Sequence, residues 1–183
     1  MNTPINQKEF YQGAMFCGTL LGGVWSLMYL LLFAGTTNTI ALLLCMVLFF
    51  SSPIMAIRIA NAYRKKACND TMTYLQAWNF TFYMYICATL LSTLISFIYF
   101  RFFDGGEFFM TIQTLLEETM RVADTDQALT QQIEQTKNII EQTTTSSFVW
   151  QIMSNNLTNS IILPLIIAIF VKKSPKDPIA PIV

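Results

Sequence analysis

The segment Gly13–Gly35 reads GAMFCGTLLGGVWSLMYLLLFAG and contains no Asp, Glu, Lys or Arg. An α-helix rises about 1.5 Å per residue, so about 20 residues cross a hydrocarbon core of about 30 Å. A helix of this length in a soluble protein carries a polar face, which this segment lacks. The segment therefore predicts a membrane-spanning helix.

Three more segments have the same character, near residues 40–60, 75–103 and 148–171. The chain is 54% hydrophobic and 12% charged, whereas soluble domains contain about 25% charged residues. The shortage of charged residues is concentrated in these four segments. No strand-like alternation of any length is present. The sequence predicts an all-α polytopic membrane protein, a single membrane domain over residues 1–183 with four transmembrane helices.

The basic residues indicate the orientation of the chain. Eight of the eleven Lys and Arg fall on one side of the predicted spans: Lys8, Arg58, Arg64, Lys65, Lys66, Lys172, Lys173 and Lys176. Basic residues close to span ends are retained in the cytoplasm. Both termini are therefore predicted to be cytoplasmic, which agrees with an even number of crossings.

The third loop, residues 104–147, is then extracytoplasmic. It holds eight acidic and two basic residues, a net charge of −6. Phe109, Ile112, Leu116 and Met120 recur at helical spacing, and Asp124–Asp126 has the composition of a turn. The loop predicts an amphipathic helical hairpin over the outer membrane face.

The residues needed for most catalysis are absent from the sequence. The chain has no histidine, its four cysteines show no C-x-x-C spacing, and no carboxylate pair or phosphate-binding loop is recognisable. We therefore expect no catalytic residue, no metal site and no cofactor, and we class the chain as non-enzymatic. The zero net charge gives no argument for nucleic acid as a partner.

Gly18 and Gly22 are four residues apart in the first span. Small residues at this spacing allow two helix backbones to approach closely. The pair is interpreted either as internal packing against another span or as the contact face of a homo-oligomer.

A basic cluster follows the second span. Its members are Arg58, Arg64, Lys65 and Lys66. Such a cluster attracts anionic lipid headgroups, a phosphate-bearing substrate or a protein partner at the inner leaflet. The simpler interpretation is an anchor that fixes the topology.

Amide side chains are placed within the spans. Gln151, Asn155 and Asn159 form one stripe of the fourth span, and Gln76 and Asn79 share a face of the third. Amides in lipid need partners, so these residues predict either hydrogen bonds between helices or the lining of a polar cavity. No ionisable residue lies at the middle of a span, which argues against charge-coupled transport.

Three motifs accompany this arrangement of spans: the basic stretch NAYRKKACND at 61–70, TYLQAWNF at 73–80, and the end of the final span, IIAIFVKK, at 166–173. With the long acidic loop, they resemble an uncharacterised family of four-span bacterial membrane proteins common in Bacteroidota. The resemblance covers nearly the whole chain. It implies a multi-pass protein of the bacterial inner membrane, encoded near a membrane-associated glycosyltransferase that uses polyprenyl-phosphate substrates, and it transfers no catalytic residue.

Two functional hypotheses follow. The first is an accessory or scaffold subunit for an envelope enzyme that handles lipid-linked glycans, with membrane lipids and the glycosyltransferase as partners. The alternative is a small oligomeric transporter, flippase-like protein or channel, in which the amides line a polar path. The direction of the amides distinguishes them, because amides bonded between helices favour the first and amides around a wet cavity favour the second.

Overall fold

The computed structural model describes residues 7–122 and 127–174, without the side chains of residues 122 and 127–130. This part of the chain forms six α-helices: α1 (Gln7–Ala34), α2 (Thr39–Ala67), α3 (Tyr74–Phe102), α4 (Glu107–Val122), α5 (Gln127–Gln142) and α6 (Thr145–Val171). Its only extended pairing is an isolated antiparallel bridge between Met72 and Lys173. The all-α prediction is confirmed. The predicted turn at 124–126 and Lys176 lie outside the described residues.

Four of these helices, α1, α2, α3 and α6, are long and apolar enough to cross a membrane, as predicted. Helix α2 continues beyond the predicted apolar segment because residues 61–67 contain neither proline nor glycine. It ends at Ala67 with Cys68 as its C-cap, after which Asn69 and Asp70 take positive φ angles of 50° and 58°. Asparagine and aspartate tolerate this conformation better than other non-glycine residues.

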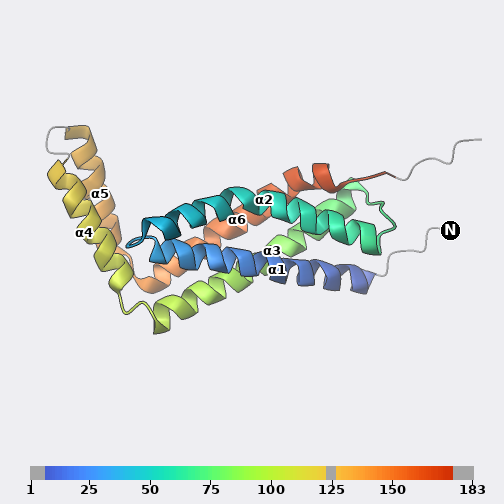
Figure 1. Ribbon diagram of the computed structural model, residues 1–183, viewed down its shortest axis with the longest axis horizontal. Coiled ribbons are helices and arrows are strands. Elements are labelled where there is room, and N and C mark those ends of the chain that lie inside the picture. The colour runs from blue at the N-terminus through green and yellow to red at the C-terminus, as the bar shows by residue number, and fades with distance from the viewer. Residues whose placement is uncertain (1–6, 123–126, 175–183) are drawn as a thin grey trace, which may run out of the picture.

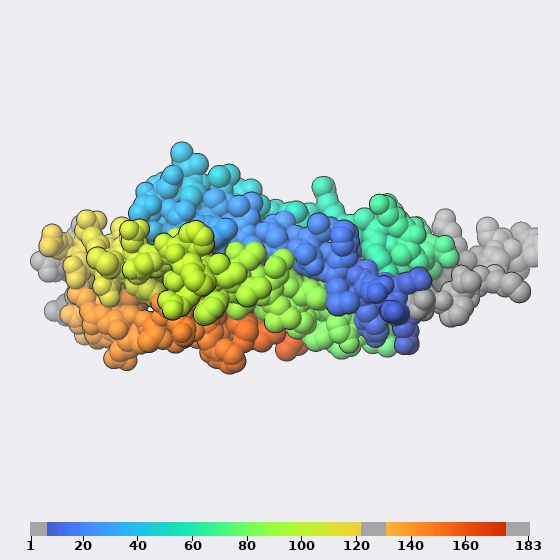
Figure 2. All heavy atoms as spheres, turned by 90° about the horizontal axis from the view of Figure 1, so that it is seen from below, coloured from blue at the N-terminus to red at the C-terminus, as the bar shows by residue number. Residues whose placement is uncertain are grey.

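The four spans lie side by side along the long axis of the molecule (Figure 1). Helix α3 packs against both α1 and α6, and Figure 2 shows these three helices together along one face. Helix α2 packs mainly on α1. Only 22% of the residues in its apolar central stretch are buried, against 44% in the corresponding stretch of α1. We infer that α2 is the span most exposed to lipid.

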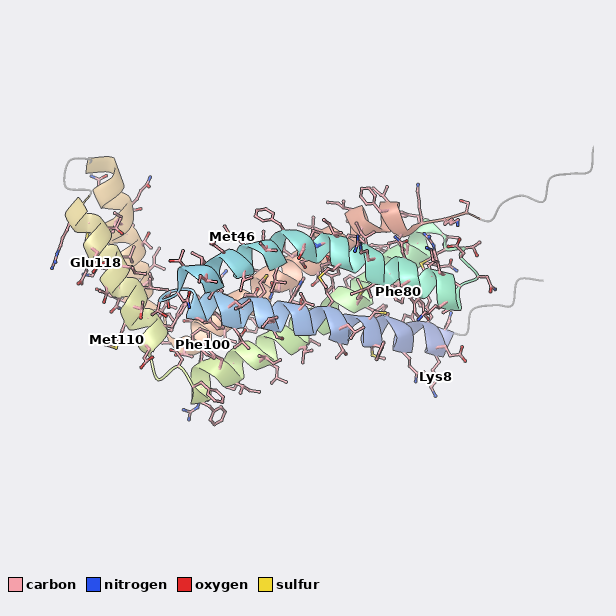
Figure 3. All side chains as sticks on the ribbon, viewed as in Figure 1. Lys8, Met46, Phe80, Phe100, Met110 and Glu118 are labelled. Atoms are coloured by element: carbon pink, nitrogen blue, oxygen red, sulfur yellow. The ribbon has the colours of Figure 1, made fainter. Side chains whose placement is uncertain are left out.

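Two clusters of aromatic residues close the two ends of the bundle. The end that holds the start of α1 is called the tail end; there Phe80 lies 5.5 Å from Phe10 and is stacked 4.4 Å from Tyr63, between ring centroids. At the other end, called the hairpin end, the ring of Phe100 lies 4.6 Å from Phe33. Figure 3 labels Phe80 and Phe100 toward opposite ends of the bundle.

Gly18 and Gly22 lie at the contact between α1 and α3. A Cβ atom added to Gly18 would lie 2.6 Å from the carbonyl oxygen of Met84, and one added to Gly22 would lie 3.0 Å from the Cα of Ala88. The first distance is shorter than real Cβ contacts allow. Within one chain, these glycines therefore serve internal helix packing.

The third loop contains the two helices predicted for it, α4 and α5. They stand across the hairpin end of the bundle at a steep angle to its axis (Figure 1). A hydrogen bond of 2.8 Å from Lys137 to Glu117 joins α5 to α4. Asp104 is buried and accepts hydrogen bonds from the backbone N–H groups of Gly106 and Phe108, which fixes the start of α4.

Candidate functional site

Arg64 lies at the tail end, and its side chain bonds to two other parts of the chain, the loop after α2 and the end of α6. Its Nε atom donates to Asp70 Oδ1 at 3.2 Å, and its Nη1 atom donates to the carbonyl oxygen of Val171. Lys173 donates to the other carboxylate oxygen of Asp70. We call Arg64, Asp70, Val171 and Lys173 the tail lock. It fastens the end of α6 to the loop between α2 and α3, beside the backbone bridge of Met72 and Lys173.

The tail lock changes the interpretation of the basic cluster. Arg64 is only 8% exposed, because it continues the buried face of α2 that Ala56 and Ala60 form at i, i+4 spacing. Its guanidinium is used inside the protein, so the prediction that Arg64 contacts lipid phosphate is corrected. Arg58 and Lys65 are exposed two turns apart on one face of α2, and Lys66 is exposed beside them.

The electrostatics of the tail lock are those of a carboxylate between two cations. The hydrogen bond from Lys173 is the largest cause that lowers the pKa of Asp70 below its usual 3.8, and Arg64 lowers this pKa further. Asp70 is therefore ionised at neutral pH and holds both basic residues.

Polar side chains in the interior of the bundle join the spans in pairs. Trp25 Nε1 donates to Ser52 Oγ at 2.7 Å, between α1 and α2. The hydroxyl of Tyr29 donates to Asn156 Oδ1 at 2.9 Å, between α1 and α6. The hydroxyls of Thr89 and Ser160 are 2.9 Å apart, between α3 and α6. These three bonds are called the interior polar contacts.

Some buried polar atoms near these contacts are not bonded to protein groups. Tyr85 Oη, Ser96 Oγ and Asn156 Nδ2 have no hydrogen-bond partner among the described residues. Tyr85 and Ser96 are fully buried, and Asn156 is 6% exposed. Buried polar groups of this kind bind ordered water where space allows.

The predicted amide stripe of α6 faces outward, away from the interior polar contacts. Gln151, Asn155 and Asn159 are all exposed on the surface of the bundle, and Gln151 Nε2 donates to Asn155 Oδ1 at 3.1 Å. The inward face of α6 carries Asn156 and Ser160 instead. Successive helical residues are rotated by about 100°, so a stripe shifted by one residue faces a different neighbour.

The structure also separates the two groups of amides. Gln76 takes part in a capping box with Thr73 at the start of α3, and Asn79 is half-buried near it. Antiparallel α3 and α6 meet at Thr89 and Ser160, which places Gln76 and Gln151 at opposite ends, about 30 Å apart. The predicted cavity shared by both groups is therefore not formed within one chain.

The comparison with protein families covers most of this architecture. The family model described as "Protein of unknown function (DUF4199)" matches residues 17–173. The chain belongs to the DUF4199 family. The matched region includes the loop helices and the tail lock as well as most of the four spans. No curated protein and no solved structure matches the chain. The family match confirms the predicted resemblance to an uncharacterised family.

The described surface of this DUF4199 protein includes open grooves at the hairpin end and on the α4–α5 hairpin. One, of about 300 Å³, is lined by apolar side chains at the hairpin end: Leu30, Ile95, Ile98, Tyr99 and Phe103. The other, of about 400 Å³, lies between α4 and α5 and is lined by Glu117, Met120, Arg121 and Lys137. The first groove is apolar, and the second combines acidic and basic groups.

Sequence reasoning overlooked several structural residues of this DUF4199 protein. The spacing of Thr73 and Gln76 is a capping-box signal that assigns Gln76 to the start of α3. The i, i+4 pair Asn156 and Ser160 was visible within a segment that is polar on several faces. No comparable signal marked the pairing of Asp70 with Lys173, because the two residues are far apart in sequence.

Proposed function

We propose that the chain is a non-enzymatic protein of the bacterial inner membrane. It acts as an accessory or scaffold subunit for an envelope enzyme that handles lipid-linked, polyprenyl-phosphate glycan substrates. Its termini face the cytoplasm and its α4–α5 hairpin faces outward. The enzyme itself is a membrane-associated glycosyltransferase.

The observation that carries this proposal is the division of polar groups between the interior and the surface. Inside the bundle, the three interior polar contacts are uncharged and join α1 to α2, α1 to α6 and α3 to α6. Side chains bonded in this way stabilise a fixed arrangement of helices. Among the described residues, the charged groups outside the tail lock lie toward the ends of the bundle and on the hairpin, where a second protein can reach them.

The basic residues suit the inner leaflet in this arrangement. Arg58, Lys65 and Lys66 are exposed, and a long basic side chain near a span end extends toward the headgroups. Each basic residue close to an anionic membrane surface contributes about 1 kcal/mol of attraction. We assign these three side chains to lipid phosphates or to the partner enzyme.

The second candidate function is a small oligomeric transporter, flippase-like protein or channel. It is favoured by the unbonded polar atoms of Tyr85, Ser96 and Asn156, which would bind water or a polar solute on a path through the bundle. Solute flux through vesicles that contain the purified chain alone would support this candidate over the scaffold.

Purification from native membranes in mild detergent tests the proposal. We expect mass spectrometry to identify a glycosyltransferase and polyprenyl-phosphate lipid bound to the wild-type chain. The double variant Lys65→Gln, Lys66→Gln should bind phospholipid or the partner about 30-fold more weakly, since two attractions of about 1 kcal/mol each are removed.

The matched control is Arg101→Gln, Arg121→Gln, which removes the same charge from exposed residues of the third span and the hairpin. This variant should keep the lipid and the partner. We call the exposed Arg58, Lys65 and Lys66 the basic face of α2. A wild-type chain that purifies with no other protein, or an equal loss of bound lipid and partner in both double variants, would contradict the proposed role of this face.

A further inference from the structure

The exposed amides of α6 form a polar stripe, with the exposed Thr158 beside it, among large apolar side chains. Gln151, Asn155 and Asn159 follow one another at intervals of four residues, so they lie on one side of the helix. Neighbouring exposed residues on α6 are large and apolar, including Trp150, Ile162 and Ile166. The buried neighbours Asn156 and Ser160 already have partners on α1 and α3, so the exposed stripe is a separate feature.

The depth of the stripe makes its exposure significant. Helix α6 has 27 residues and is about 40 Å long, so a hydrocarbon core of about 30 Å covers its central part. Asn159 lies next to the midpoint of the helix, Asn155 one turn nearer to the hairpin end, and Gln151 one turn beyond Asn155. All three amides therefore lie at hydrocarbon depth. Lipid tails offer amides no hydrogen bonds, so polar residues at this depth face protein or water.

The hydrogen-bonding groups of the stripe are complementary to those of the same stripe on a second copy. The bond from Gln151 Nε2 to Asn155 Oδ1 leaves the Gln151 carbonyl oxygen free to accept and the Asn155 amide nitrogen free to donate. Asn159 has both a donor and an acceptor. None of the three is charged, so two stripes meet without repulsion.

The symmetry of the membrane favours a second copy. Two copies insert with the same orientation, so a two-fold axis along the membrane normal brings equal depths of α6 together. Asn155 and Asn159 then face their own counterparts, and the two Asn159 amides can exchange two N–H to O=C bonds. The longer Gln151 side chain reaches the Asn155 amide of the second copy, one turn away.

We propose that two copies of the chain associate through this stripe, which we call the α6 amide interface. The inference is independent of the scaffold function, because a dimer can bind an enzyme or act without one. It assigns Gln151, Asn155 and Asn159 to contact between copies and leaves the basic face of α2 free for a partner.

Energy transfer between labelled chains in lipid vesicles measures the association. The wild-type chain should dimerise as the protein-to-lipid ratio rises. Asn155→Leu, Asn159→Leu should weaken association about tenfold or more, which corresponds to the loss of several interhelical amide bonds. Asn155→Gln, Asn159→Gln keeps the amides and should restore most of it. Thr19→Leu, at an exposed polar position of α1, is the control and should associate as the wild type does.

Cross-linking gives a second readout that does not require a change in affinity. Asn159→Cys should form an intermolecular disulfide under mild oxidation, whereas Thr19→Cys and the wild-type chain should not. The inference is overturned if the wild-type chain remains monomeric at every ratio, or if the leucine variant associates as tightly as the wild type. Cross-linking of Asn159→Cys to a different protein, with no product between copies, would assign the stripe to a foreign helix and would also overturn it.

Discussion

Gly18→Ala is expected to lower the free energy of unfolding by about 2 kcal/mol, within the range for overpacked cores. The added methyl group would lie 2.6 Å from the carbonyl oxygen of Met84 and 2.7 Å from the Cβ of Cys87. The carbonyl belongs to the backbone of α3, so no side-chain rotation relieves the overlap. Helices α1 and α3 must separate, and this contact is the most extensive between any two helices of the described chain.

Gly23→Ala is the matched control on the same helix. No atom lies within 4 Å of a Cβ added to Gly23, so alanine meets open space there. Alanine is favoured over glycine in a helix by about 1 kcal/mol, so this variant should be as stable as the wild type or more so. Unfolding in a titration of denaturing detergent, followed by circular dichroism, measures the difference. Equal stability of the two variants would contradict the close contact of α1 and α3.

Arg64→Gln is the second change with a large expected effect, a loss of about 2–3 kcal/mol of unfolding free energy. Removing one member of a buried ion pair costs about 3–5 kcal/mol, and the partial exposure of Asp70 reduces this value. The variant also leaves the carbonyl oxygen of Val171 without the guanidinium that it accepts from. The exposed neighbour Lys65→Gln should change stability by less than about 0.5 kcal/mol. Equal losses of unfolding free energy in the two variants would contradict the stabilising role of the Arg64 bonds to Asp70 and Val171.

The tail lock should also respond to acid. The folded-state pKa of Asp70 is lowered, so its pairing contributes stability above its ordinary pKa of 3.8, where the unfolded chain is ionised too. This contribution is lost as the pH falls below 3.8 and through the lowered value. Asp70→Asn should therefore be less stable than the wild type at neutral pH, and the gap should narrow in acid. A gap that stays constant with pH would contradict the ionic part of the lock.

Features that depend on long repetition could be predicted from the sequence. Four segments without charge over about 20 residues each predict spans whatever their neighbours are, and all four are helices of 27 to 29 residues. The pattern of Phe109, Ile112 and Leu116 likewise predicted α4, because a helical period shows within a single segment.

Features that depend on which helix lies beside which could not be predicted in the same way. Helix α6 is polar on more than one face, so its sequence did not distinguish the buried Asn156 from the exposed Asn155. Arg64 appeared to belong with Lys65 and Lys66, but its buried position depends on the end of α6 reaching the loop after α2. Such contacts join residues that are distant in sequence and require the packed structure.

Site-specific labelling tests the central claim that the chain crosses the membrane four times with its hairpin outside and its basic end inside. Single cysteines would replace the exposed residues Glu134 in α5 and Lys66 in α2, and spheroplasts would be treated with a membrane-impermeant maleimide. The wild-type chain serves as the blank, since its natural cysteines are buried or half-buried. The account predicts labelling of Glu134→Cys in intact spheroplasts and of Lys66→Cys only after permeabilisation. The reverse pattern, or a chain that stays in solution without detergent, would contradict it.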